Sequence, residues 1–225
     1  MLSLKLGLSL VNRRLQGSWQ PSDEARLDAW YKRATGITLN GDDVSKWNDQ
    51  SGRNIHMEQG TASEQPLYNS GDIDFDSAAT QNLQTTGQIS LGGDFTIGVK
   101  LHLKTAGGVL LADNTTAGEF IRFTGTQELR VRIDNATAVN IAKDSGTFVE
   151  DAYMVLQRAS NVLTLYWNGT AQADTETLSG TADIDAIGVR STDLNPYDGE
   201  ISEIAIFSSQ SATLTSNLNN YLSKI

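Results

Sequence analysis

The sequence predicts an all-β fold in which antiparallel strands form a two-sheet sandwich. Short stretches of alternating apolar and polar residues recur along the chain, the best being Phe95–Lys104. Turn signals separate these stretches, the clearest being Asn168-Gly169. The 225 residues include 20 glycines but only 3 prolines, and Thr, Ser and Asn are abundant, which suits strands and tight turns. A closed barrel is the alternative, although long variable loops favour the sandwich.

Further strands follow from the same alternation. Leu129–Ile133 and Ile201–Phe207 each have the length and composition of a strand with one face on a core. Val162–Trp167 and Thr170–Glu176 flank Asn168-Gly169. Because a type I′ turn requires positive φ at both central residues, Asn-Gly between two such stretches predicts a β-hairpin.

The N-terminal residues alternate strictly and predict an extended arm. We expect residues 1–20 to be this arm and its linker, and residues 21–225 to be the sandwich domain. The arm is either an edge strand of the sandwich or a strand added to another subunit, which would favour self-association. The candidate assembly residues share an apolar character and are Leu2, Leu4, Leu6, Leu8, Leu10 and Trp19.

Two short helices are expected outside the strands. Ser22 is a suitable N-cap for a helix over residues 22–33. Near the C-terminus, Leu214, Leu218, Tyr221 and Leu222 recur at helical spacing and predict a helix over residues 212–224.

Composition excludes several classes of partner and site. With 27 acidic and 17 basic residues the formal charge is −10, so neither nucleic acid nor an anionic membrane surface is an expected partner. No apolar stretch is long enough to span a membrane. Arg13 and Arg14 stand where a signal peptide would be cleaved, so we expect no signal peptide. Without cysteine there is no disulfide framework.

Several segments, in order, resemble a known family. Leu27–Lys32, Thr35–Leu39, Val44–Gly52, Gly93–Ile97 and Tyr197–Phe207 are similar to segments of laminin G-like, concanavalin A-like jelly rolls of bacteriophage and bacterial proteins. The resemblance spans residues 25–225 and implies a jelly-roll arrangement followed by a short C-terminal helix. Such domains serve sugar binding, cell adhesion, virion assembly and, in some relatives, hydrolysis, so the fold does not decide the function.

A catalytic pair is not expected. Related jelly-roll glucanases carry Glu-x-Asp-x-Glu on one strand, which directs the carboxylates into one cleft. The nearest match here is Glu200-Ile201-Ser202-Glu203, and the spacing of three places Glu200 and Glu203 on opposite sides of a strand unless a bulge intervenes. Neither His56 nor His102 accompanies a nucleophile motif. We therefore predict that the chain is not an enzyme and keep glycoside hydrolysis as a remote alternative.

Two sets of residues are candidates for ligand binding. A glycan site needs exposed aromatic rings beside amides or carboxylates, although a tryptophan in such a sandwich more often packs in the core. The candidates for it are Trp47, Asn48, Asp49 and Tyr197. Calcium prefers oxygen ligands from Asp and Asn, whose alternative role is to cap turns. The candidates for it are Asp113, Asn114, Asp193 and Asp198, and no other cofactor is predicted.

The combined features predict a bacteriophage virion structural protein, such as a capsid decoration, head fibre or tail component. It would be made in the host bacterial cytoplasm, anchored by its arm to other virion proteins, and would display the jelly roll. The alternative is a carbohydrate-binding or host-adhesion module that recognises a cell-surface glycan.

Overall fold

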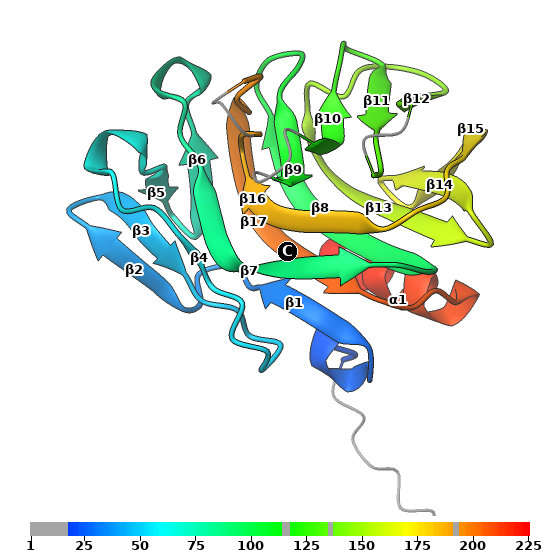
Figure 1. Ribbon diagram of the computed structural model, residues 1–225, viewed down its shortest axis with the longest axis horizontal. Coiled ribbons are helices and arrows are strands. Elements are labelled where there is room, and N and C mark those ends of the chain that lie inside the picture. Colours follow the sequence, from blue (N-terminus) through cyan, green and yellow to red (C-terminus); the bar gives the residue numbers. More distant parts are fainter. Residues whose placement is uncertain (1–17, 114–117, 135–136, 191–193) are drawn as a thin grey trace, which may run out of the picture.

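The computed structural model describes residues 18–113, 118–134, 137–190 and 194–225. In this part the chain is mostly β-strand, with one α-helix, α1 (Ala212–Leu222), near the C-terminus (Figure 1). The prediction of an all-β chain that ends in a short helix is therefore confirmed. Several predicted site residues lie outside the described residues: Leu2, Leu4, Leu6, Leu8, Leu10, Asn114 and Asp193.

The strands are short and follow one another closely along the chain. They are β1 (Leu27–Tyr31), β2 (Ile37–Asn40), β3 (Asp43–Trp47), β4 (Met57–Glu58), β5 (Leu67–Asn69), β6 (Asp72–Phe75), β7 (Leu83–Leu91), β8 (Phe95–Leu103), β9 (Val109–Asp113), β10 (Gly118–Phe123), β11 (Glu128–Val131), β12 (Val139–Ala142), β13 (Asp151–Ala159), β14 (Val162–Trp167), β15 (Thr170–Thr177), β16 (Ala182–Ile187) and β17 (Gly199–Phe207). Three 3-10 turns, η1 (Pro21–Asp23), η2 (Ala62–Glu64) and η3 (Ser77–Ala79), lie between them.

Antiparallel pairing joins these strands into one large, nearly closed sheet. One layer runs from β17 through β8, β13 and β14 to β15, and β17 also pairs with β6 and β1 along its other edge. The other layer runs from β4 through β7, β16, β9, β10 and β11 to β12. β3 and β5 connect the layers, because β3 pairs with β4 and β5, and β5 pairs with β6.

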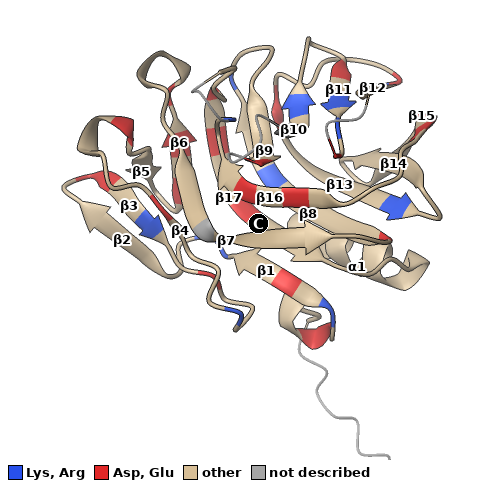
Figure 2. Ribbon diagram, in the orientation of Figure 1, with Lys and Arg blue, Asp and Glu red and all other residues tan. Residues whose placement is uncertain are grey.

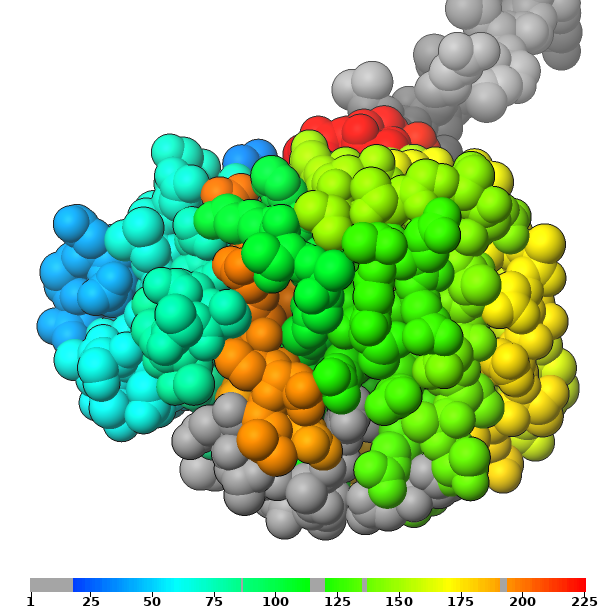
Figure 3. Space-filling model, turned by 90° about the horizontal axis from the view of Figure 1, so that it is seen from above, coloured from blue at the N-terminus to red at the C-terminus, as the bar shows by residue number. Residues whose placement is uncertain are grey.

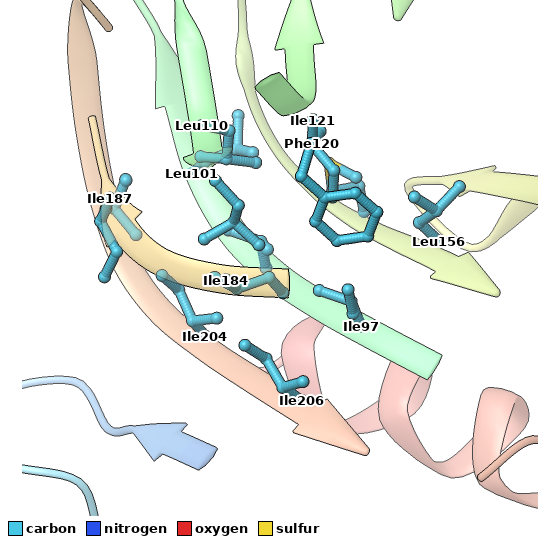
Figure 4. Close-up of a cluster of buried hydrophobic side chains, with 14 of the residues drawn as sticks. Ile97, Leu101, Leu110, Phe120, Ile121, Leu156, Ile184, Ile187, Ile204 and Ile206 are labelled. Carbon is cyan, nitrogen blue, oxygen red and sulfur yellow. The ribbon is translucent and has the colours of Figure 1, made fainter. Parts of the chain in front are cut away.

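The apolar core lies between these layers. Inward side chains of β8 and β17 are matched in register, with Ile97 opposite Ile206 and Leu101 opposite Ile201. Ile184 and Ile187 of β16 approach them from the other layer (Figure 4). Since successive side chains of a strand point to opposite faces, the alternation read from the sequence places the apolar set here.

Helix α1 covers part of the outer face of β8 and β13. Leu214, Leu218 and Leu222 form a second apolar cluster with residues that include Val155 and Phe207. Ser211 caps the helix, since its hydroxyl accepts a hydrogen bond of 3.0 Å from the Leu214 amide. The amphipathic spacing of the helix therefore predicts its packing correctly.

The prediction of a helix over residues 22–33 is wrong. Pro21–Asp23 form η1, and Leu27–Tyr31 form strand β1, which pairs with β17. All five residues of β1 are buried: Ala29 and Tyr31 contact the main core, while Leu27 and Trp30 contact the cluster under α1. A strand buried on both faces shows no alternation, so its sequence is ambiguous between helix and strand.

The predicted hairpin is confirmed. β14 and β15 flank Asn168 and Gly169, whose φ angles are 48° and 79°.

The distribution of charged residues reflects the excess of acidic over basic residues in the sequence. Acidic residues occur on most strands visible in Figure 2, whereas basic residues are fewer and lie on strands that include β3, β10 and β11.

Segments that are distant in sequence meet at one end of the molecule. Viewed from above in Figure 3, the start of β17 lies at the surface between the β5–β6 part of the chain and the β9–β10 part. The amide of Lys104 donates a 3.0 Å hydrogen bond to the carbonyl of Asp198, and the amide of Val109 donates a 2.8 Å hydrogen bond to the carbonyl of Asn195.

No helix in the described part of the chain is long and apolar enough to cross a membrane.

Candidate functional site

A polar groove of about 800 Å³ opens beside strand β4. We call it the β4–β7 groove; it is lined by residues 53–56 and 58–61, by Glu64 and, on β7, by Gln84, Thr85 and Gly87. Its volume falls within the range of roughly 300–1,000 Å³ typical of small-molecule sites. Such sites are mostly apolar, whereas carboxylate, amide, imidazole, hydroxyl and guanidinium groups line this one.

A buried network of amides fixes the floor of the groove. Gln59 Nε2 donates to Glu64 Oε2 at 3.1 Å and to Asn82 Oδ1 at 2.9 Å. Gln84 Nε2 donates to the same Asn82 oxygen at 2.9 Å, and Asn82 is fully buried. Because buried polar groups are costly to leave unpaired, these bonds hold Gln59, Glu64 and Gln84 in single orientations.

Asp49 fixes one wall of the groove from beneath. Its Oδ1 accepts hydrogen bonds from the amides of Trp30 at 2.9 Å and Ser51 at 2.8 Å. Its Oδ2 accepts from the Ser51 hydroxyl at 2.7 Å and the Ile55 amide at 3.3 Å. The side chain is 7% exposed, so it positions the loop over residues 51–56 and does not itself face solvent.

The loop also orients His56, whose side chain borders the groove. The Asp49 amide donates to His56 Nδ1 at 3.1 Å. Because Nδ1 accepts, the neutral ring carries its proton on Nε2, which is then a donor. The Tyr31 hydroxyl supports the same loop by donating to the carbonyl of Ile55 at 2.7 Å. Burial, aided by the charge of Asp49, raises the pKa of Tyr31, which therefore remains a neutral donor.

The aromatic residues predicted to bind glycan are core residues instead. Trp47 and Tyr197 are both fully buried, so neither ring can stack on a sugar. The Trp47 ring packs against the Tyr31 ring, with 5.6 Å between the ring centres, and Trp47 Nε1 donates to the carbonyl of Lys32 at 3.1 Å. Asn48 donates to the carbonyl of Gly36 at 2.7 Å. Of the predicted set, Asp49 alone contributes to the groove, through the loop that it holds.

Trp19, a candidate assembly residue, packs on the domain itself, and its role in assembly stays a prediction. It is half-buried against the cluster under α1, with its ring 5.9 Å from that of Tyr221 and nearly perpendicular to it. Its Nε1 donates to Glu24 Oε1 at 3.2 Å. An indole at the edge of an apolar cluster gains more from packing there than from exposure.

Of the calcium candidates, Asp113 and Asp198 lie in the described part of the chain, and the predicted calcium site stays a prediction. Asp198 Oδ2 accepts from the Thr105 hydroxyl at 2.8 Å, and Asp113 ends strand β9 with 9% exposure. Among the described residues, no group of three or more His, Cys, Asp or Glu side chains could hold a metal ion.

Glu200 and Glu203 share one face of β17, contrary to the expectation for a regular strand. A bulge between Ile201 and Glu203 shifts the register, so Glu200 lies opposite His102 and Glu203 lies opposite Lys100. Glu203, however, is 1% exposed. Its Oε1 accepts from Trp30 Nε1 at 2.6 Å and from the Tyr221 hydroxyl at 2.5 Å. This carboxylate is therefore engaged in packing α1 and β1 on the sheet.

Sequence reasoning missed the residues that form the groove. Gln59 and Gln84 are separated by many residues and belong to none of the motifs that the sequence analysis identifies. Only the pairing of β4 with β7, through Glu58 and Gln84, brings them together. No spacing pattern in one sequence encodes that long-range contact.

No family model and no curated protein matches the chain. Solved structures do match. A tryptophan-to-alanine mutant of HCR D/C VPI 5995 is 13% identical with a TM-score of 0.59, and the match covers 90% of this chain and 53% of that one. Trypanosoma rangeli sialidase in complex with the inhibitor DANA is 13% identical with a TM-score of 0.55, covering 86% of this chain and 32% of the sialidase.

Domain 4 of AbnA, an extracellular arabinanase from Geobacillus stearothermophilus in complex with arabinotriose, matches at 16% identity with a TM-score of 0.48, covering 87% of this chain and 99% of that one. That likeness is too slight to support an argument. The chain spans about half the length of the first matched structure and about a third of the sialidase. At these identities the matches show a shared β fold.

These comparisons correct two predictions. The prediction of a bacteriophage virion structural protein is wrong, since the structures that share the fold include a sialidase and give no link to a virion or laminin G protein. The prediction that the chain is not an enzyme is contradicted as well, because the sialidases are enzymes.

Proposed function

We propose that the chain is a carbohydrate-binding domain of jelly-roll type and that the β4–β7 groove is its binding site. One observation carries the proposal: a groove of about 800 Å³ lined by polar side chains, several of which a buried amide network holds in place. The facing layers and the nearly closed pairing support the jelly-roll description.

The lining of the groove matches the chemistry of a saccharide. Each sugar hydroxyl both donates and accepts, so a binding site needs acceptors and donors side by side. Glu58 and Glu64 supply carboxylate acceptors, and His56 supplies a donor at Nε2. An apolar ligand would displace water from these groups and offer no hydrogen bond in return, which would cost more than its burial gains.

Rigidity supports the same conclusion. Hydrogen-bonding side chains that are already fixed lose little conformational entropy when a ligand binds. The sialidase match adds that a related fold occurs in a protein that acts on sugars. The polar lining of the groove is the reason for proposing a saccharide ligand, and the proposed source of that saccharide is a cell-surface glycan.

Blocking the groove tests the proposal. A Cβ built at Gly60 would meet no atom within 4 Å, and Gly60 does not have a positive φ, so the backbone accepts a side chain there and Gly60→Trp places a bulky ring at the groove. Gly93 is equally open and does not line the groove, so Gly93→Trp is the matched control. A glycan array identifies a ligand for the unmodified chain, and calorimetry measures its affinity for both variants.

We expect Gly60→Trp to weaken binding by at least about tenfold, because a bulky ring displaces the saccharide from its partners. Gly93→Trp should bind as the unmodified chain does. Equal affinities for all three proteins would show that the ligand binds elsewhere, and an array without any bound glycan would reject the proposal.

A further inference from the structure

A second, smaller cavity lies where the N-terminal segment meets α1. Its volume is about 200 Å³, roughly that of six or seven water molecules, which suits a single sugar ring. We call it the α1 pocket and define it by Trp19, Asn217, Asn220, Tyr221 and Lys224. It shares no residue with the β4–β7 groove.

The spacing of the helical residues explains the pocket. Positions 217, 220, 221 and 224 follow the i, i+3, i+4, i+7 pattern, so their side chains project from one side of α1 and of the turn that follows it. This side adjoins the one formed by Leu214, Leu218 and Leu222, which packs on the sheet, and Tyr221 borders both. Together with Trp19 it lines the cavity with two amides, an aromatic ring and an ammonium group.

Both aromatic rings are held by their polar ends. Trp19 Nε1 donates to Glu24 at 3.2 Å, and the Tyr221 hydroxyl donates to Glu203 at 2.5 Å. Burial and the hydrogen bond to Glu203 raise the pKa of Tyr221, so its hydroxyl stays protonated. Because carboxylates already accept from these polar atoms, what the two lining residues can offer a ligand is the hydrocarbon surface of their rings.

We propose that the α1 pocket binds one pyranose residue that carries a carboxylate, such as a terminal uronic acid. The C–H face of the sugar would pack on Trp19, and the amides of Asn217 and Asn220 would pair with its hydroxyls. The ammonium of Lys224 would face the carboxylate. This site is independent of the function proposed for the groove.

Tryptophan fluorescence gives a direct measurement. Trp30, Trp47 and Trp167 are at most 5% exposed, whereas Trp19 is half-buried, so acrylamide should quench mainly Trp19. The probes are glucuronic acid and methyl glucoside, added to the full chain. We expect both to protect the fluorescence from quenching, with glucuronic acid effective at a roughly two- to fivefold lower concentration, as expected for an exposed ion pair.

Surface variants of α1 separate binding from folding. Asn217→Ala and Asn220→Ala should each weaken protection by about fivefold, because each loses a hydrogen bond. Alanine favours the helix, so neither change should unfold it. Lys224→Gln should abolish the preference for glucuronic acid but keep binding of methyl glucoside. Ser216→Ala, on the same helix but outside the pocket, is the control and should change nothing.

Four results would overturn the proposal: no quenchable emission in the free chain, no protection by either probe, protection unaffected by the asparagine variants, or protection lost in Gly60→Leu, which places a side chain at the groove without adding a tryptophan. The last would place the probe in the β4–β7 groove. Conversely, if the groove binds no glycan while Asn217→Ala and Asn220→Ala weaken protection, the α1 pocket stands and the proposal for the groove fails.

Discussion

Arg158 is a charged residue inside the fold, with 1% of its surface exposed. Its guanidinium donates to the carbonyls of Leu91 at 3.0 Å and Gly180 at 2.8 Å, and it also donates to the carbonyl of Gly93. It lies 4.8 Å from the centre of the Phe95 ring. Burial lowers the pKa of Arg158, although the nearby charges of Asp94 and Asp134 oppose the shift. The guanidinium therefore joins the β7–β8 turn to the segment between β15 and β16, and each of these segments connects one layer of the sheet to the other.

We predict that Arg158→Lys destabilises the protein by about 2–4 kcal/mol, because a single ammonium cannot reach all three carbonyls and leaves buried acceptors unpaired. Urea denaturation measures the change. Arg26 is exposed, and Arg26→Lys should stay within about 0.5 kcal/mol. An Arg158→Lys protein as stable as that control would show that the buried guanidinium is not needed.

Glu150 forms an ion pair with Lys143 and also accepts a hydrogen bond from the core residue Trp167. Its Oε1 lies 2.6 Å from Lys143 Nζ and accepts a 2.6 Å bond from Trp167 Nε1. Burial tends to raise the pKa of Glu150, but the hydrogen bonds from Lys143 and Trp167, with the charge of Lys143, lower it overall. A carboxyl whose folded-state pKa lies below its unfolded value stabilises the fold above the unfolded value, near pH 4.3.

We therefore predict that this contribution is lost as the pH falls through the folded pKa. The difference in unfolding free energy between the unmodified chain and Glu150→Gln should be largest near neutral pH and should shrink below about pH 4. Denaturation measured across the acid range checks the prediction. Asp42→Asn, at an exposed carboxylate in the turn between β2 and β3, is the control. A difference that is constant with pH would contradict the assignment.

At the scale of the element, one glycine determines where α1 lies. A Cβ built on Gly98 of β8 would meet Leu218 Cδ2 at 2.6 Å and Cγ at 2.7 Å. Leu218 is itself fully buried, so it has little room to move. The absence of a side chain at position 98 is therefore what allows the helix to approach the sheet so closely.

We predict that Gly98→Ala destabilises the protein by about 1–3 kcal/mol by overpacking this contact. Leu218→Ala alone should cost about 2–5 kcal/mol. In the double variant the added methyl group occupies part of the space left by Leu218. The loss of unfolding free energy in the double variant should therefore be smaller than the sum of the losses in the two single variants. Strict additivity in a double-mutant cycle would show that the two positions do not contact each other.

The sequence predicted some elements well for local reasons. The β14–β15 hairpin follows from Asn168 and Gly169, whose positive φ angles suit these residue types. The strand β1 was mistaken for a helix because contacts with β17 and α1 bury it on both faces. The bulge that aligns Glu200 with Glu203 is equally invisible in the sequence, since it arises from the pairing of β17 with β8.

At the scale of the molecule, the described residues form a core without the first 17 residues. The expectation that residues 1–20 form an assembly arm and residues 21–225 the domain remains a prediction. Deleting residues 1–17 should leave the melting temperature nearly unchanged, since the main apolar cluster lies in the described part of the chain. Light scattering of both forms would test self-association: an oligomer that becomes a monomer supports the arm, and two monomers argue against it.

The sequence by itself determined the β class, the face of each alternating strand that enters the core, the hairpin turn and the C-terminal helix, because these depend on periodicity and local backbone preference. Tertiary structure decided the burial of Trp47 and Tyr197, the amide network beneath the groove and the pocket beside α1. Those features require contacts between residues far apart in the chain. A pattern in one sequence cannot specify such contacts, because each partner alone is equally compatible with solvent.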